Sequence, residues 1–354
     1  MMNYLQQLCL ATLITVSSLP THAATYPATV PSDQYLKILS STDESVMQTL
    51  IADYQTLFPE VTVEYQDRNT INLFKRFLKN YEQGETADLI ISSAMDLQIK
   101  LVNDGYAANH SMESLAWLPD WAQWRQQAFG FTYEPAVVVY NKDLLSESHI
   151  PENRFDLIET LRDQSELFTE RVGTYDIDKS GFGYLIASQD AQQASTWGRL
   201  TENLKKVKVK LYDSTGAMIN AVQQGKLLLS YNVLGSYAYA ARERYDNLGI
   251  ILLSDYTLVM SRVAFVSKRA KNPAQGHHFL NYLLSERGQQ LLANNAKLYP
   301  IHPAAKGEAT YSELQKKAQH KGPLKLIKLG PALLTYQDTL KQKNFLKEWG
   351  NLLR

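Results

Sequence analysis

Cysteine is nearly absent from this sequence of 354 residues. The single cysteine, Cys9, lies within an apolar run from Leu8 to Val16, which is too short to cross a bilayer. Small residues follow this run, and Thr21-His22-Ala23 suits cleavage before Ala24. We therefore predict that residues 1–23 form a secretory signal peptide. The mature chain, exported to a bacterial periplasm, should then contain no cysteine and no disulfide.

A net charge of one sign is also missing, because 36 Lys and Arg residues balance 36 Asp and Glu residues. A nucleic-acid-binding protein needs a basic surface, so this balance argues against nucleic acid as a partner. After the signal segment the sequence has no apolar run long enough for a membrane anchor, no repeat of fixed period and no low-complexity tract. The remaining chain of about 330 residues is long enough for two lobes with separate cores.

The common catalytic motifs are missing as well. The sequence contains no G-x-S-x-G, S-x-x-K, H-E-x-x-H or Walker A motif. The segment DIDKSG at 176–181 begins like a calcium loop, but its twelfth position is Ala187 instead of a bidentate Glu. His277 and His278 are adjacent on a predicted helix and would point about 100° apart, so they cannot chelate one metal together. We therefore predict no catalytic residues, no metal and no cofactor.

What the sequence does have is a series of turns rich in Ser and Thr, each placed between a predicted strand and a predicted helix. They lie at residues 40–43, 92–94, 176–183 and 213–216. Loops at the carboxyl ends of parallel strands meet at one edge of a sheet, so these turns predict a shared crevice. In the third turn, Ser180 is a good N-cap, and Gly181 and Gly183 would allow close approach of a ligand. Such a helix start can bind an anion, although it can also be an ordinary connection.

Hydrophobic periodicity predicts alternating strands and helices over most of the chain. Strands are expected at 36–39, 61–65, 88–91, 136–141, 172–174, 207–211, 227–231 and 258–266. Helices are expected at 44–58, around 73–83, within 151–170, and from 180, 197, 215, 273 and 331 onward, with Thr215 and Ser285 as N-caps.

A family resemblance follows from the motif around the third turn. Gly173-Thr174-Tyr175-Asp176 with Ser180-Gly181-Phe182-Gly183-Tyr184 resembles the second-lobe signature of type II periplasmic solute-binding proteins. The branch that it resembles serves the uptake of ferric iron, thiamine and organophosphates. Supporting segments lie at 212–216, 231–237, 255–262 and 270–285, and the similarity extends over residues 36–303.

The resemblance implies an α/β fold of two lobes, the Venus flytrap, in which each lobe is a mainly parallel sheet flanked by helices. We expect lobe 1 at residues 24–138 with a return segment at 256–300, lobe 2 at 139–255, and a helical tail at 301–354. The ligand would bind between the lobes. The predicted ligand-binding residues are Ser41, Thr42, Ser93, Ala94, Asn141, Ser180, Gly181, Phe182, Gly183, Ser214, Thr215, Asn232, Ser236, Tyr237 and Arg262.

The choice of ligand depends on Tyr231 and Asn232. Iron-binding members of the branch usually carry two adjacent tyrosines at about this position, whereas this sequence has Asn as the second residue. A neutral amide supplies no charge to a hard ferric ion. A small phosphorylated or carboxylated ligand fits the hydroxyls, the helix ends and Arg262 better, although Arg262 in a structural salt bridge is an equal alternative. Ferric iron remains an alternative ligand.

The resemblance also implies partners. We predict a monomeric receptor that is not an enzyme and that delivers a small molecule to an ABC permease in the inner membrane. The alternative partner is a sensor histidine kinase, because some relatives of this fold act as periplasmic sensors.

Overall fold

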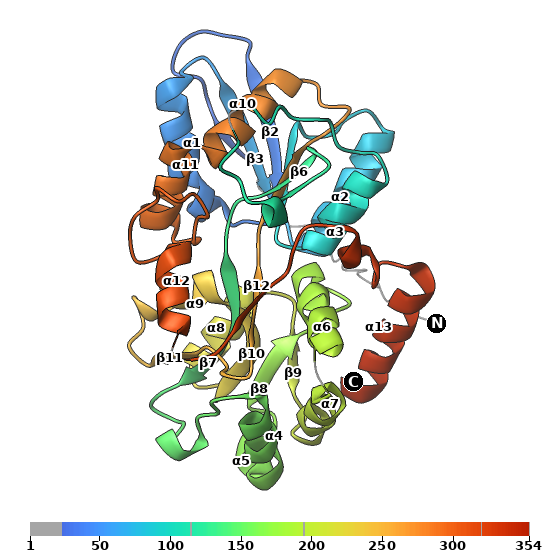
Figure 1. Ribbon diagram of the computed structural model, residues 1–354, viewed down its shortest axis with the longest axis vertical. Helices are drawn as coiled ribbons and strands as arrows, with labels where there is room; N and C mark the ends of the chain where they lie inside the picture. Colours follow the sequence, from blue (N-terminus) through green and yellow to red (C-terminus); the bar gives the residue numbers. More distant parts are fainter. Residues whose placement is uncertain (1–22, 114, 194, 320, 354) are drawn as a thin grey trace, which may run out of the picture.

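The structure is a computed structural model that describes residues 23–113, 115–193, 195–319 and 321–353. The predicted signal peptide lies outside the described residues except for Ala23. Two sheets, each with helices on its faces, form an upper and a lower lobe in Figure 1. No helix among the described residues is long and apolar enough to cross a membrane.

Within the described residues, the first lobe contains a seven-stranded sheet. In spatial order its strands are β1 (Ala23–Tyr26), β3 (Thr62–Asp67), β2 (Tyr35–Ser40), β4 (Leu89–Ser92), β13 (Val263–Val266), β6 (Ala128–Gly130) and β5 (Gln123–Trp124). Its helices include α1 (Glu44–Leu57), α2 (Thr70–Glu82), α3 (Met95–Asn103), α10 (Pro273–Leu284) and α11 (Glu286–Leu291), with a π-helical segment η3 (Leu292–Ala296). The three central strands β3, β2 and β4 are parallel, whereas the outer pairs are antiparallel. The sheet is therefore mixed.

The second lobe contains a sheet of the strands β14 (Leu324–Leu326), β12 (Thr257–Met260), β7 (Glu134–Asn141), β10 (Leu229–Leu234), β8 (Val172–Tyr175) and β9 (Lys210–Tyr212), with β11 (Leu248–Ile251) also paired to β7. Its helices include α4 (Arg154–Asp163), α5 (Ser165–Phe168), α6 (Gly181–Gln193), α7 (Trp197–Lys206), α8 (Thr215–Gln223) and α9 (Gly235–Arg242). Strands β10, β8 and β9 are parallel. Their carboxyl ends, like those of β2, β3 and β4, lead into the loops between the lobes.

In the described part of the chain, the strands change sheet after β6, after β12 and again between β13 and β14. The predicted single strand at 258–266 is in fact two strands: β12 belongs to the second sheet, β13 to the first, and Ser261 and Arg262 separate them. Strand β7, which contains the expected lobe boundary at 138, belongs to the second sheet over its whole length. Hydrophobic alternation marks a strand but does not reveal which sheet it joins, because both sheets bury side chains in the same way.

The carboxyl-terminal tail adds further contacts between the lobes. After β14 in the second lobe, Leu329 donates its backbone N–H to Trp121 of the first lobe. The short helix η4 (Pro331–Leu334) then lies against α3, and α13 (Thr339–Leu353) packs on α7 of the second lobe, as Figure 1 shows at the right. The aromatic rings of Trp197 and Trp349 stack at this last contact, 5.7 Å apart.

Two local predictions need correction. The segment 207–211 is not a strand with alternating lysines: α7 continues to Lys206, and only Lys210–Tyr212 form β9. Lys208 takes a positive φ of 51° between the two, which breaks the extended backbone that the alternation requires. The N-cap of α8 is Ser214, whose hydroxyl accepts from Ala217 N at 3.4 Å, and not Thr215.

Candidate functional site

A cleft of about 270 Å³ lies between the two lobes. The strand-to-helix turns of both lobes form its walls, as the sequence predicts for loops at the carboxyl ends of parallel strands. Its lining residues are Ser41, Asp43, Asp67, Arg68, Asn69, Thr70 and Ser93 from the first lobe, Arg262 from the crossing, and Tyr175, Ser180, Phe182, Asp213, Ser214, Thr215, Gly216, Leu234 and Tyr237 from the second lobe.

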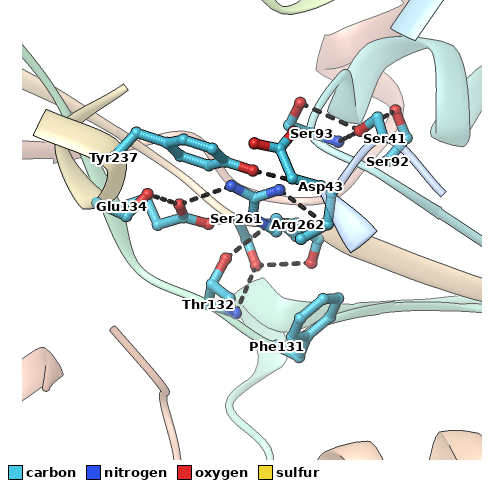
Figure 2. Close-up of polar contacts among 12 residues, drawn as sticks. Ser41, Asp43, Ser92, Ser93, Phe131, Thr132, Glu134, Tyr237, Ser261 and Arg262 are labelled. Carbon is cyan, nitrogen blue, oxygen red and sulfur yellow. Dashed lines mark hydrogen bonds and ion pairs between the residues drawn. The ribbon is translucent and has the colours of Figure 1, made fainter. Parts of the chain in front are cut away.

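The hydroxyl groups of the first lobe are linked to one another at the ends of β2 and β4. Ser93 N donates to Ser41 Oγ at 3.0 Å, and the two hydroxyl oxygens lie 3.4 Å apart. Ser92 Oγ lies 3.4 Å from Ser41 Oγ, as the dashed lines of Figure 2 show. Because a hydroxyl both donates and accepts, this group can turn its protons toward a ligand's oxygen atoms.

Three hydrogen bonds join the lobes across the cleft. Gly181 N donates to Thr70 Oγ1 at 2.8 Å, and Asn69 Nδ2 donates to the backbone oxygen of Asp213 at 3.0 Å. At the other side of the cleft, Asp43 N donates to the hydroxyl of Tyr237 at 3.3 Å. The lobes are therefore in contact, and the cleft is in a closed arrangement.

The start of α6 is organised by its own residues and by the first lobe. Ser180 is the N-cap, since its hydroxyl accepts from Gly183 N at 3.1 Å. A Cβ atom on Gly181 would lie only 3.0–3.1 Å from Leu97, Ala94 and Thr70 of the first lobe. The two glycines therefore provide close contact between protein segments, and not the close approach of a ligand that we expected, because the N–H groups of both also have protein acceptors.

Arg262 lies at the crossing between the lobes, where its charge is compensated. Its guanidinium donates to Glu134 twice, at 2.9 Å from Nε and 3.2 Å from Nη2, and to Thr42 Oγ1 at 2.7 Å from Nη1. Arg262 and Glu134 are 1% and 0% exposed, and Ser236 also donates to the Glu134 carboxylate. Figure 2 shows this pair beside the ring of Tyr237. The geometry is that of a buried salt bridge whose guanidinium also forms part of the cleft wall.

Of the predicted ligand-binding residues, eight line the cleft: Ser41, Ser93, Ser180, Phe182, Ser214, Thr215, Tyr237 and Arg262. The other seven lie outside it: Thr42, Ala94, Asn141, Gly181, Gly183, Asn232 and Ser236. Buried partners explain some of these positions. Asn141 donates its amide to Val222 O at 2.8 Å, and Asn232 donates to Asp190 at 2.7 Å inside the second lobe.

The lining residues missed by the sequence reasoning include a complete turn. Residues 67–70 lead from the last residue of β3 to the first residue of α2, with the same polar pattern as the turns that we singled out. This location between a strand and a helix was the sequence signal that could have identified these residues as part of the cleft. Within the described part of the chain, no carboxylate lies within salt-bridge distance of Arg68, whose Nη1 donates to the backbone oxygen of Asp67 at 2.6 Å. Asp43 and Asp213, which also line the cleft, belong to turns that we did predict.

Tyr231 belongs to a buried network in the second lobe. Its hydroxyl donates to Asp190 at 2.7 Å and accepts from Arg154 Nε at 2.7 Å, and the residue is 2% exposed. Burial raises the pKa of the Tyr231 hydroxyl well above its usual value, which disfavours the phenolate that a ferric ion would need.

Comparisons with known proteins place this geometry in a family. Residues 40–290 match the family described as bacterial extracellular solute-binding protein. A comparison with curated proteins gives no match. The substrate-binding protein of an ABC transporter from Agrobacterium tumefaciens is 35% identical, with a TM-score of 0.89 over 95% of this chain and 100% of that chain.

Two further solved structures show the same fold at lower identity. AfuA from Actinobacillus pleuropneumoniae, with exogenous fructose-6-phosphate bound, is 15% identical, with a TM-score of 0.74 over 91% of this chain and 99% of that chain. Iron-bound HitA from Pseudomonas aeruginosa is 19% identical, with a TM-score of 0.69 over 90% of this chain and 99% of that chain. The family match and the Agrobacterium relative decide the assignment: the chain belongs to the bacterial extracellular solute-binding proteins and is the solute-binding protein of an ABC transporter.

Proposed function

We propose that this solute-binding protein captures a small organic ligand with a phosphate or carboxylate group in the cleft between its lobes, and presents it to an ABC permease in the inner membrane. The observation that carries the proposal is Arg68. Arg68 lines the cleft, and no carboxylate of the described residues lies within salt-bridge distance of its guanidinium. A guanidinium is well suited to bind the oxygens of a phosphate or carboxylate, often with two parallel hydrogen bonds.

The groups around Arg68 support the same class of ligand. Hydroxyls of Ser41, Ser93 and Thr215 line the cleft, and the amino-terminal end of α6 faces it from the second lobe. A helix start carries a partial positive charge, which favours an anion. Arg262 contributes less to the attraction of an anionic ligand than its charge alone would suggest, since Glu134 neutralises that charge.

The fold is compatible with such a ligand, because AfuA has fructose-6-phosphate bound. Ferric iron, the ligand of HitA, is the alternative. We favour the organic anion because the Tyr231 hydroxyl and the Asn232 amide are both engaged by Asp190 in the interior of the second lobe.

A thermal-shift screen of the mature protein against phosphorylated and carboxylated metabolites tests the proposal, since a ligand that binds only the folded state raises the melting temperature. We expect Arg68→Gln to weaken the best acid at least about tenfold, or about 1.4 kcal/mol, in calorimetry. Arg76→Gln is the matched control, because Arg76 is an exposed residue on α2, the helix that follows Arg68.

Two results would overturn the proposal. One is a screen in which no acid raises the melting temperature. The other is a stoichiometric reddish complex after incubation with chelated ferric iron, since phenolate ligands give ferric ions a visible absorption band.

A further inference from the structure

The charges around the cleft are not those of a site for a simple anion. Three carboxylates line it, those of Asp43, Asp67 and Asp213, against the two guanidiniums of Arg68 and Arg262. Glu134 cancels the charge of Arg262 through a salt bridge of 2.9 Å. Arg68 is then the one uncompensated cation among the described lining residues, and the carboxylates outnumber it. A ligand that carried only negative charge would be repelled by this excess.

Asp43 is a carboxylate of the cleft wall that does not cap its own helix. It is the N-cap residue of α1, and an Asp at this position normally accepts a hydrogen bond from a backbone N–H of the first turn. Here the Asp43 side chain makes no such bond. The carboxylate of Asp67, from the neighbouring turn, instead accepts from Glu44 N at 3.0 Å. The first turn of α1 is thus capped by Asp67, and the Asp43 side chain lines the cleft, where the Tyr237 hydroxyl is its hydrogen-bond partner.

The surroundings of Asp43 favour a cation. No Lys, Arg or His of the described residues lies within salt-bridge distance of its carboxylate. Its backbone N–H donates to the Tyr237 hydroxyl, and Figure 2 shows the Asp43 side chain between Tyr237 and the serines at 41 and 93. Desolvation beside the cleft raises the pKa of Asp43; the charge of Arg262 and a hydrogen bond with Tyr237 lower it, and Asp67 raises it further, so that it stays above its usual value. A positively charged group placed here would add to the effect of Arg262 and offset the desolvation that keeps the pKa raised.

We propose that the ligand is a zwitterion whose cationic nitrogen binds the carboxylate of Asp43. Its acid group then lies on the side of Arg68 and the start of α6. This inference rests on the proposed function, because it adds a second group to the acid already assigned to the cleft. The ligand class is a small amino acid or aminoalkyl phosphate, in keeping with a cavity of about 270 Å³.

Matched pairs of acids that differ only in an amino group test the inference. Each acid that raises the melting temperature in the screen is measured by calorimetry beside its counterpart with or without the amine. β-Alanine against propionate and phosphoethanolamine against ethyl phosphate are included in every case. We expect the aminated member to bind at least about tenfold more tightly to the parent protein.

The tenfold ratio in the parent corresponds to about one charged contact. Asp43→Asn should reduce this ratio to within about twofold, because an amide cannot form the ion pair. Asn is itself a good N-cap residue, so the variant keeps α1. Asp33→Asn is the control, since Asp33 is exposed and lies outside the cleft, and it should keep the ratio of the parent.

The outcomes separate the two proposals. Equal affinities within the pairs, or an unchanged ratio in Asp43→Asn, would overturn the zwitterion and leave the acid-binding function in place. If no acid raises the melting temperature, both proposals fail. An amine without an acid group that binds as tightly as the aminated acids would overturn the acid-binding function, because Arg68 would then contribute nothing.

Discussion

The buried pair of Arg262 and Glu134 allows a sharp prediction about stability. Glu134→Gln removes the carboxylate charge with little change in shape and leaves the guanidinium, 1% exposed, without a counterion. Breaking a buried pair from one side costs about 3–5 kcal/mol, because the remaining charge stays buried and unpaired. A whole domain is stable by only about 5–15 kcal/mol, so the loss is a large fraction of the total. We expect the melting temperature to fall by roughly 10 °C.

The double variant Glu134→Gln/Arg262→Met provides the comparison that identifies the cause. Once the guanidinium is replaced by an apolar side chain of similar length, no uncompensated charge remains, and most of the lost stability should return. Unfolding in urea, with midpoint and slope both measured, gives the free energies. Asp163→Asn, which breaks the exposed pair of Arg162 and Asp163, is the control and should leave the midpoint unchanged.

Two results would refute this reasoning. The free energy of unfolding of Glu134→Gln could lie within about 1 kcal/mol of the parent value, with the same dependence on urea concentration. The pair would then contribute little to stability. Alternatively, the double variant could be less stable than Glu134→Gln alone. Ligand affinity adds a second readout: if Arg262 is mainly structural, a folded double variant should bind its ligand within about threefold of the parent.

Four further predictions concern other elements. Gly183→Ala places a Cβ atom 2.3 Å from the Cβ of Tyr175, so α6 must move away from β8. We expect the free energy of unfolding in urea to fall by about 1–3 kcal/mol. Unchanged stability would contradict this contact. Gly181→Ala places a Cβ atom 3.0–3.1 Å from its three nearest neighbours, which all belong to the first lobe. It should therefore weaken ligand binding, measured by calorimetry, while the melting temperature of the unliganded protein stays as in the parent. Burial raises the pKa of Asp96 from 3.8 to about 7, so the folded state keeps a proton that the unfolded chain releases. Stability should therefore fall as the pH rises from about 4 to about 7, and Asp96→Asn should abolish this fall in melts across that range; the same slope in the variant would argue against Asp96 as its source. Finally, sequencing of exported protein should begin at or near Ala24, whereas an intact Met1 in the cytoplasmic fraction would refute the signal peptide.

The sequence by itself determined the features that depend on neighbouring residues. The hydroxyl-rich turns, most of the helix and strand periods and the Ser180 cap each arise within a few residues and are present in the structure. The alternating strand expected at 207–211 is the exception, since the end of α7 and the short β9 take its place. A strand followed by a polar turn and a helix also predicts that the turn lies at the carboxyl end of the sheet. Most of the cleft could therefore be located from sequence, including the turn at 67–70, which has the same pattern but was not among the predicted ligand-binding residues.

Only the tertiary structure decided which polar groups remain available to a ligand. Arg262 and Glu134 are 128 positions apart, and Gly181 and Thr70 are 111 apart, yet each pair is joined by hydrogen bonds. Asp43 faces the cleft because Asp67, from another turn, caps α1 in its place. The division of residues 258–266 between two sheets is likewise set by the tertiary structure. A charged or polar side chain looks the same in sequence whether it binds a ligand or a distant residue, because its partner depends on which segments the packed lobes bring together.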